Sequence, residues 1–221
     1  MMRSARFAFF GAFVCLALAS HAAAQAPVAP GKVVVLKAAR MFDGRGDTLT
    51  TPGLVVVKDG KIVAAGPAAS VPAGAEVIDL GDATLLPGFI DAHTHQTSGT
   101  ADDWKQAALD RLQKPIAEQA LDSSVNVKKT LMAGFTTVRD LGANDQIDVG
   151  LRNAIRNGKI VGPRMLVSVH AIGATGGHCD DWGGFRQGLV PETTPEQGVA
   201  NGPDAVRRAV RIAHKYGADV I

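Results

Sequence analysis

The chain has 221 residues, of which 46% are hydrophobic and 20% are charged. This is the composition of an ordinary globular protein with enough apolar material for a core. The net charge of +2 is too small to indicate nucleic acid or an anionic membrane as a partner.

The first 24 residues are typical of a secretory signal peptide. Arg3 and Arg6 form a basic region, residues 7–19 are an apolar run, and three alanines at 22–24 precede Gln25. The run is short for a membrane-spanning helix, which needs about 20 residues. We therefore expect cleavage before Gln25, a periplasmic or secreted product and no stable membrane insertion. An uncleaved anchor is the alternative.

The two cysteines predict no intrachain disulfide. Cys15 lies inside the expected signal peptide, which leaves Cys179 in the mature chain. Cys179 adjoins His178. A catalytic thiol normally needs a base that is positioned to activate it, and we do not expect Cys179 to be a nucleophile.

Residues 25–84 are rich in strand patterns. The run of three valines and a leucine at 33–36 predicts a strand, and residues 54–65 predict a hairpin around Asp59-Gly60. Asp-Gly is favoured in type I′ turns because both central residues need a positive φ. Further short strands are expected at 77–80 and 84–86. Alone, these strands make a small sheet with an incomplete core.

From residue 85 onward the pattern changes to strands that alternate with helices. Ile147, Leu151 and Ile155 recur every four residues, as on one face of a helix. The expected elements are a strand at 85–92, a helix at 126–132 ended by Gly134, a strand at 135–139, a helix at 147–155 ended by Gly158, a strand at 164–169, a helix from Pro203 to Gly217 and the start of a strand at 218–221.

This alternation predicts an α/β fold with parallel strands. Three strand–helix units and the start of a fourth are about half of an eight-stranded (β/α)8 TIM barrel, which takes roughly 250 residues. An open flavodoxin-like sheet is the alternative, but it explains neither the preceding β-rich segment nor the histidine pair that follows the first strand.

His93 and His95 lie two residues apart after an apolar strand. In a strand this spacing points both side chains to one side, where both imidazoles could bind one divalent ion. The active sites of barrels lie at the same end of the strands. A bare His-x-His also occurs by chance, and the alternative is a pair of surface histidines.

The segment 86–95, LPGFIDAHTH, resembles the first-strand signature of the amidohydrolase superfamily. Residues 57–62 resemble that family's N-terminal β-sandwich, and residues 133–140 resemble its second helix-to-strand junction. Residues 174–178, ATGGH, are similar to a loop of the imidazolonepropionase-like branch, which contains secreted Xaa-Pro dipeptidases (prolidases). The resemblance covers residues 33–221.

The resemblance implies that residues 25–84 are part of a β-sandwich and that residues 85–221 are the first half of the barrel. It also implies two divalent metal ions, commonly zinc, with His93 and His95 as ligands of the more buried ion. A carboxylated lysine would bridge the two ions at the position after Ile221, and the other catalytic residues would follow it. This chain alone would then hold no complete catalytic centre and be inactive.

Other residues near the expected strand ends are weaker candidates. His170 ends the third strand and His178 follows two glycines in the next loop, where both could contact substrate. Arg139 and Asp140 end the second strand, where they could form a local ion pair that supports the rim or could contact substrate.

The function implied is an exported, metal-dependent amidohydrolase. It would cleave the amide bonds of Xaa-Pro-like dipeptides or N-acyl amino acids with metal-activated water. Two alternatives remain: a lactone, ester or phosphotriester hydrolase of the same superfamily, and a catalytically inactive fragment. The expected partner is a small-molecule or dipeptide substrate. The sequence is also compatible with a homo-oligomer.

Overall fold

The computed structural model describes residues 31–98, 103–180, 182 and 184–221. The chain divides into two compact units, Met1–Leu85 and Leu86–Ile221. The expected signal peptide lies outside the described residues. Among the residues described, no helix is long and apolar enough to cross a membrane.

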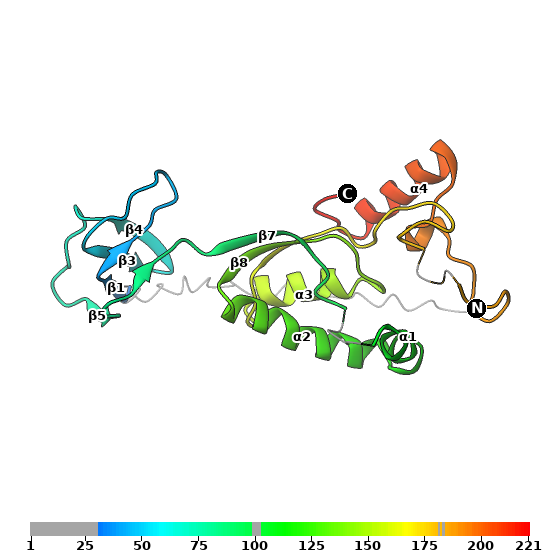
Figure 1. Cartoon of the computed structure of the whole chain (residues 1–221), viewed down its shortest axis with the longest axis horizontal. Coiled ribbons are helices and arrows are strands. Elements are labelled where there is room, and N and C mark those ends of the chain that lie inside the picture. The colour runs from blue at the N-terminus through cyan, green and yellow to red at the C-terminus, as the bar shows by residue number, and fades with distance from the viewer. Residues whose placement is uncertain (1–30, 99–102, 181, 183) are drawn as a thin grey trace, which may run out of the picture. The chain divides into compact units, whose positions relative to one another are not determined.

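The first unit consists of short strands (Figure 1). They are β1 (Val33–Ala38), β2 (Arg40–Met41), β3 (Gly53–Lys58), β4 (Lys61–Ala65), β5 (Glu76–Asp79) and β6 (Thr84–Leu85). Four strands form a sheet in the order β4-β3-β1-β5, in which β1 is antiparallel to β3 and parallel to β5. β2 and β6 form a separate parallel pair.

The predicted hairpin is confirmed as β3 and β4, which pair in antiparallel fashion. Asp59 and Gly60 have φ values of 53° and 72°, so both central residues of the turn lie in the left-handed region. A type I′ turn requires this conformation, and its twist matches that of the two strands.

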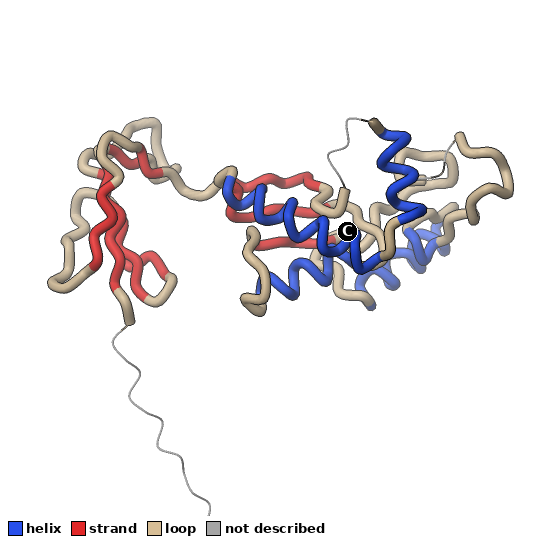
Figure 2. The backbone as a smooth tube through the Cα atoms, turned by 90° about the horizontal axis from the view of Figure 1, so that it is seen from below, coloured by secondary structure: helices blue, strands red, loops and turns tan. Residues whose placement is uncertain are grey.

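The second unit is an α/β structure. Its strands are β7 (Phe89–Thr94), β8 (Phe135–Asp140) and β9 (Arg164–Val167), and its helices are α1 (Trp104–Gln113), α2 (Ile116–Met132), α3 (Ile147–Arg156), the 3-10 helix Pro195–Gln197 and α4 (Gly202–Lys215). The three strands form a parallel sheet in the order β7-β8-β9. α2 and α3 lie on one face of this sheet (Figures 1 and 2).

The core of the second unit lies between the sheet and these two helices. Val127 of α2, Val138 of β8 and Leu151 of α3 are buried together with Met165 and Val167 of β9. Burial alternates along β9, where Arg164 and Leu166 are exposed on the opposite face. Strand residues with one covered face alternate in this way because successive side chains point to opposite faces. In the described part of the chain, the face of β9 away from the helices is therefore exposed.

The strand predicted at 85–92 is wrong at both ends. Thr84 and Leu85 form β6 of the first unit, which confirms the short strand expected at 84–86. β7 begins only at Phe89 and runs on to Thr94. The intervening Pro87 has no N–H to donate to a strand neighbour. Gly88 lies so close to Thr136 that a Cβ would stand 2.1 Å from the Thr136 Cγ2 atom.

Two helical segments were not predicted from the sequence. α1 was not expected at all, although Asp103 caps it by accepting a hydrogen bond from the Lys105 N–H at 2.8 Å. α2 begins at Ile116 rather than at residue 126, directly after Pro115 and with Glu118 in its first turn. The helices expected at 147–155 and from Pro203 are confirmed as α3 and α4.

The ends of the third and fourth predicted strands also differ. β9 stops at Val167 because Val169 has a φ of 71°, a left-handed conformation that ends the strand and is unfavourable for a β-branched residue. Residues 218–221 form no strand. The Asp219 N–H nevertheless donates to the Val167 carbonyl at 2.7 Å, so the segment lies beside β9.

Candidate metal centre

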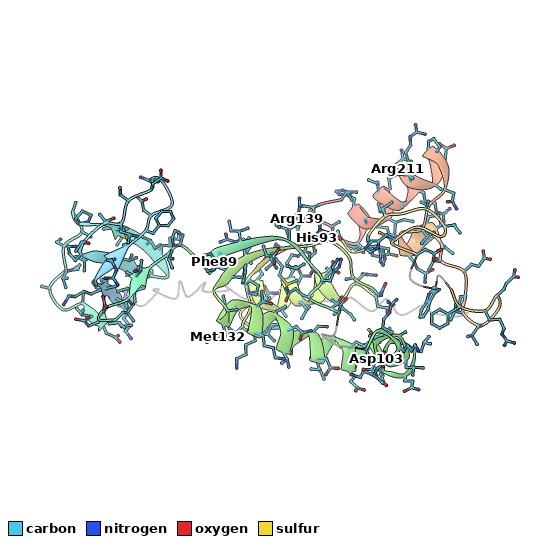
Figure 3. The ribbon with its side chains drawn as sticks, viewed as in Figure 1. Phe89, His93, Asp103, Met132, Arg139 and Arg211 are labelled. Carbon is cyan, nitrogen blue, oxygen red and sulfur yellow. The ribbon has the colours of Figure 1, made fainter. Side chains whose placement is uncertain are left out.

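The carboxyl ends of the three parallel strands meet at one edge of the sheet. Thr94 is in register with Asp140, and Asp140 is in register with Val167. The residues that follow these positions line a cavity of about 350 Å³. Binding sites in parallel α/β sheets are found at this edge. Figure 3 labels His93 and Arg139 there.

His93 and His95 point toward one another, with 3.3 Å between their Nε2 atoms. The Nδ1 atom of His95 lies 3.2 Å from the carbonyl oxygen of Gly142. A carbonyl oxygen only accepts, so Nδ1 carries the proton in this hydrogen bond and Nε2 is left to present its lone pair. Metal-binding histidines are oriented by such contacts.

The geometry of this pair fits a metal ion. Two nitrogens that each lie about 2.0–2.1 Å from one tetrahedral zinc ion are about 3.3–3.4 Å apart. The distance between the two Nε2 atoms agrees with this value. In the part of the chain that the structure describes, however, no group of three or more His, Cys, Asp or Glu side chains is placed to hold a metal ion. The pair therefore accounts for two ligands and no more.

The two other candidate histidines line the same cavity as His93 and His95. His170 is half-buried, and its Nδ1 atom lies 3.0 Å from the Ala143 carbonyl, so its Nε2 atom is the one left for a ligand. His178 is exposed, and the half-buried Cys179 lies beside it with no disulfide partner among the described residues. The roles of His170 and His178 stay predictions.

The ion pair considered between Arg139 and Asp140 is wrong. Arg139 is exposed and donates from Nε to the Ala92 carbonyl at 2.6 Å. Asp140 is fully buried and accepts hydrogen bonds from the Thr94 hydroxyl at 3.0 Å and the Gln96 N–H at 2.7 Å. Both residues support the rim, but each does so by binding the β7 segment instead of its neighbour.

Burial raises the pKa of Asp140 to about 6, even though the hydrogen bonds from Gln96 and Thr94 lower it. Burial also raises the pKa of Asp148, a second fully buried carboxyl group. Because the folded state holds the Asp140 proton more tightly than the unfolded state, this group stabilises the fold below about pH 3.8. That contribution is lost as the pH rises through 6.

Asp140→Asn tests this pH dependence because asparagine keeps the shape and the accepting oxygen but cannot ionise. Relative to the unsubstituted chain, the variant should gain about 2–3 kcal/mol of unfolding free energy between pH 4 and pH 7.5. Urea denaturation of metal-free protein at both pH values measures the difference. An unchanged difference at the two pH values would contradict the raised pKa.

Comparisons with known proteins show the family to which this chain belongs. A model of the amidohydrolase family matches residues 84–221, and the chain therefore belongs to that family. The crystal structure of a Xaa-Pro dipeptidase with bound methionine in the active site matches with a TM-score of 0.72 and 32% identity, over 85% of this chain and 46% of that chain. A prolidase complexed with N-methylphosphonate-L-proline matches with a TM-score of 0.69 and 29% identity, over 85% and 45% of the two chains.

The ochratoxinase of Aspergillus niger is 29% identical over 206 residues, which make up 86% of this chain and 41% of the ochratoxinase. The chain thus spans less than half the length of each of these three relatives. The resemblance to the amidohydrolases, predicted from the 86–95 motif, is confirmed. The resemblance to the branch with the Xaa-Pro dipeptidases, predicted from residues 174–178, is confirmed as well.

Proposed function

We propose that the whole protein is an exported, metal-dependent amidohydrolase that cleaves the amide bonds of dipeptides, with Xaa-Pro peptides as its first substrates. The observation that carries the proposal is the 3.3 Å separation of the His93 and His95 Nε2 atoms at the carboxyl end of β7. The relatives named above as a Xaa-Pro dipeptidase and a prolidase favour the dipeptide class.

In this proposal the second unit is the first half of a (β/α)8 barrel, and the first unit is part of a β-sandwich. The open face of the β7-β8-β9 sheet supports it, since Ile90 and Leu166 are apolar strand residues with exposed fractions of 71% and 40%. Apolar side chains at such positions need a partner surface. The remaining strands of a barrel would supply that surface.

Two divalent ions, which we expect to be zinc, would polarise the scissile carbonyl and lower the pKa of a water molecule toward neutrality. His93 and His95 would hold one of them through their Nε2 atoms. A carboxylated lysine after Ile221 is expected to complete the pair of sites. The Gly142 carbonyl keeps the His95 proton on Nδ1, which leaves Nε2 available for binding.

His170 and His178 would contact the substrate at the same cavity. For His170 the supporting observation is the bond from Nδ1 to Ala143, which fixes the ring and leaves Nε2 for a substrate group. His170→Ala should raise KM about 5- to 10-fold, the loss of one hydrogen bond, with a smaller change in kcat. Steady-state kinetics measures both constants, and an unchanged KM would exclude this contact.

The substrate class is tested with zinc-loaded protein expressed from the complete gene. Xaa-Pro dipeptides, other dipeptides, N-acyl amino acids, a lactone and a phosphotriester are compared by kcat/KM. The proposal predicts the highest value for an Xaa-Pro dipeptide. A highest value for the lactone or the phosphotriester would overturn it.

Export is tested separately by the mass of the protein recovered after expression with its N-terminal segment. A mature chain that begins at Gln25 supports cleavage, whereas an intact N-terminus in a membrane fraction supports an uncleaved anchor.

A further inference from the structure

The residues on both sides of His95 are bound by one carboxylate oxygen. The Thr94 hydroxyl and the Gln96 N–H both donate to the Oδ1 atom of Asp140, at 3.0 and 2.7 Å. Thr94 lies between the two histidines and turns its hydroxyl toward Asp140, while the histidines project to the other side of the strand. Asp140 thus restrains the His-x-His segment from the side of the strand opposite the two imidazoles.

The far side of the same segment is tied to α2. The Thr130 hydroxyl donates to the Gln96 side-chain oxygen at 2.9 Å, and the Asn126 amide donates to the Gln96 carbonyl at 3.2 Å. Gln96 is only 7% exposed. The ring of His95 is itself bound, through Nδ1, to the Gly142 carbonyl. Hydrogen bonds therefore restrain both the imidazole of His95 and the residues on either side of it.

Asp140 is unfavourable for stability where it lies. It occupies a fully buried position two residues from Val138 on β8, and its Oδ2 atom has no hydrogen-bond partner among the described residues. A buried, incompletely bonded carboxyl group costs free energy that an apolar side chain would not. Packing alone therefore does not explain a carboxyl group at this position, whereas its two bonds to the β7 segment do.

We propose that Asp140 is the positioning residue of the His93–His95 pair and keeps the two Nε2 atoms at the spacing of two ligands of one metal ion. It acts through Thr94 and Gln96 and touches neither the metal nor the substrate. The inference rests on the proposed function in one respect, that the pair binds a metal ion.

The test compares Asp140→Leu, which removes the accepting oxygens, with Asp140→Asn, which keeps one. Asp148→Leu is the matched control because Asp148 is equally buried but accepts from the Val149 and Val169 N–H groups, away from β7. Each variant is expressed from the complete gene. Circular dichroism checks its fold, and calorimetry measures its Zn²⁺ affinity. Nitrogen-15 NMR of the metal-free protein reports which nitrogen of His95 carries the proton.

Asp140→Leu should weaken Zn²⁺ binding at least about tenfold, the size of effect found when the groups that orient a metal ligand are lost. It should also reduce the fraction of His95 protonated at Nδ1. Asp140→Asn and Asp148→Leu should keep both quantities near those of the unsubstituted chain. A folded Asp140→Leu variant with an unchanged Zn²⁺ affinity and an unchanged His95 proton position would overturn the inference.

Thr94→Val decides the matter if Asp140→Leu does not fold. It removes one of the two donors with little change in shape and should shift both readouts in the same direction by a smaller amount. No shift in either readout would overturn the inference. If the unsubstituted protein expressed from the complete gene binds no Zn²⁺, the proposed function fails, and the inference is then judged on the His95 proton position in metal-free protein.

Discussion

His93→Ala and His95→Ala should each abolish tight zinc binding and lower kcat/KM for amide hydrolysis by roughly a thousandfold or more in the whole protein, because activation of water requires the metal. The two Nε2 atoms are 3.3 Å apart, and among the described residues no group of three or more His, Cys, Asp or Glu side chains is placed to hold a metal ion. The loss of either imidazole therefore leaves only one of the two ligands. Metal content by mass spectrometry and steady-state kinetics measure the two effects.

His214→Ala is the matched control for these variants. His214 lies exposed on α4 and does not line the cavity, so its loss removes an imidazole without touching the site. It should leave metal content and activity unchanged. Full zinc content in His93→Ala would show that the pair is not a metal site.

Arg152→Leu should lower the unfolding free energy by about 2–3 kcal/mol, somewhat less than the loss of a fully buried ion-pair partner. The Arg152 Nη1 atom donates to the Asp219 carboxylate and to the Gly217 carbonyl, both at 2.6 Å. The same Asp219 oxygen accepts from the Val167 N–H at 3.1 Å. The side chains of Arg152 and Asp219 are 10% and 27% exposed, so the variant leaves a largely buried carboxylate without its cation.

Urea denaturation measures this loss, with Arg207→Leu as the control. Arg207 pairs with Asp204 on the surface of α4, where the two side chains are 65% and 97% exposed. Exposed pairs contribute little because water and salt screen them, so the control should show no measurable change. Equal effects of the two variants would mean that the Arg152–Asp219 pair does not stabilise the packing of the segment after α4 against α3.

The elements that could be predicted from sequence are those with a local cause. The β3–β4 turn follows from Asp59-Gly60, and α3 follows from apolar residues at four-residue spacing. α1 and α2 are less strongly amphipathic than α3 and α4. Asp103 and Pro115 were only weak signals for the positions at which α1 and α2 begin. The division of the predicted 85–92 strand between two units depends on the pairing of β6 with β2, which no local pattern reveals.

The residues of the candidate site also differ in whether they could be predicted from the sequence. His93 and His95 could be recognised because their spacing and the preceding strand lie within ten residues. The contacts that orient them could not, because Gly142 contributes a backbone carbonyl and Asp140 acts from the neighbouring strand. Asp140 looked from sequence like a partner of Arg139, and only the register of β7 and β8 places it behind Thr94.

The central claim, that His93 and His95 bind one metal ion, is tested most directly by anomalous X-ray diffraction from crystals of the zinc-loaded protein. We predict a zinc peak about 2.0–2.1 Å from the Nε2 atoms of both histidines, the distance of a zinc–imidazole bond. A zinc peak elsewhere, with these two nitrogens still bonded to each other, would contradict the account.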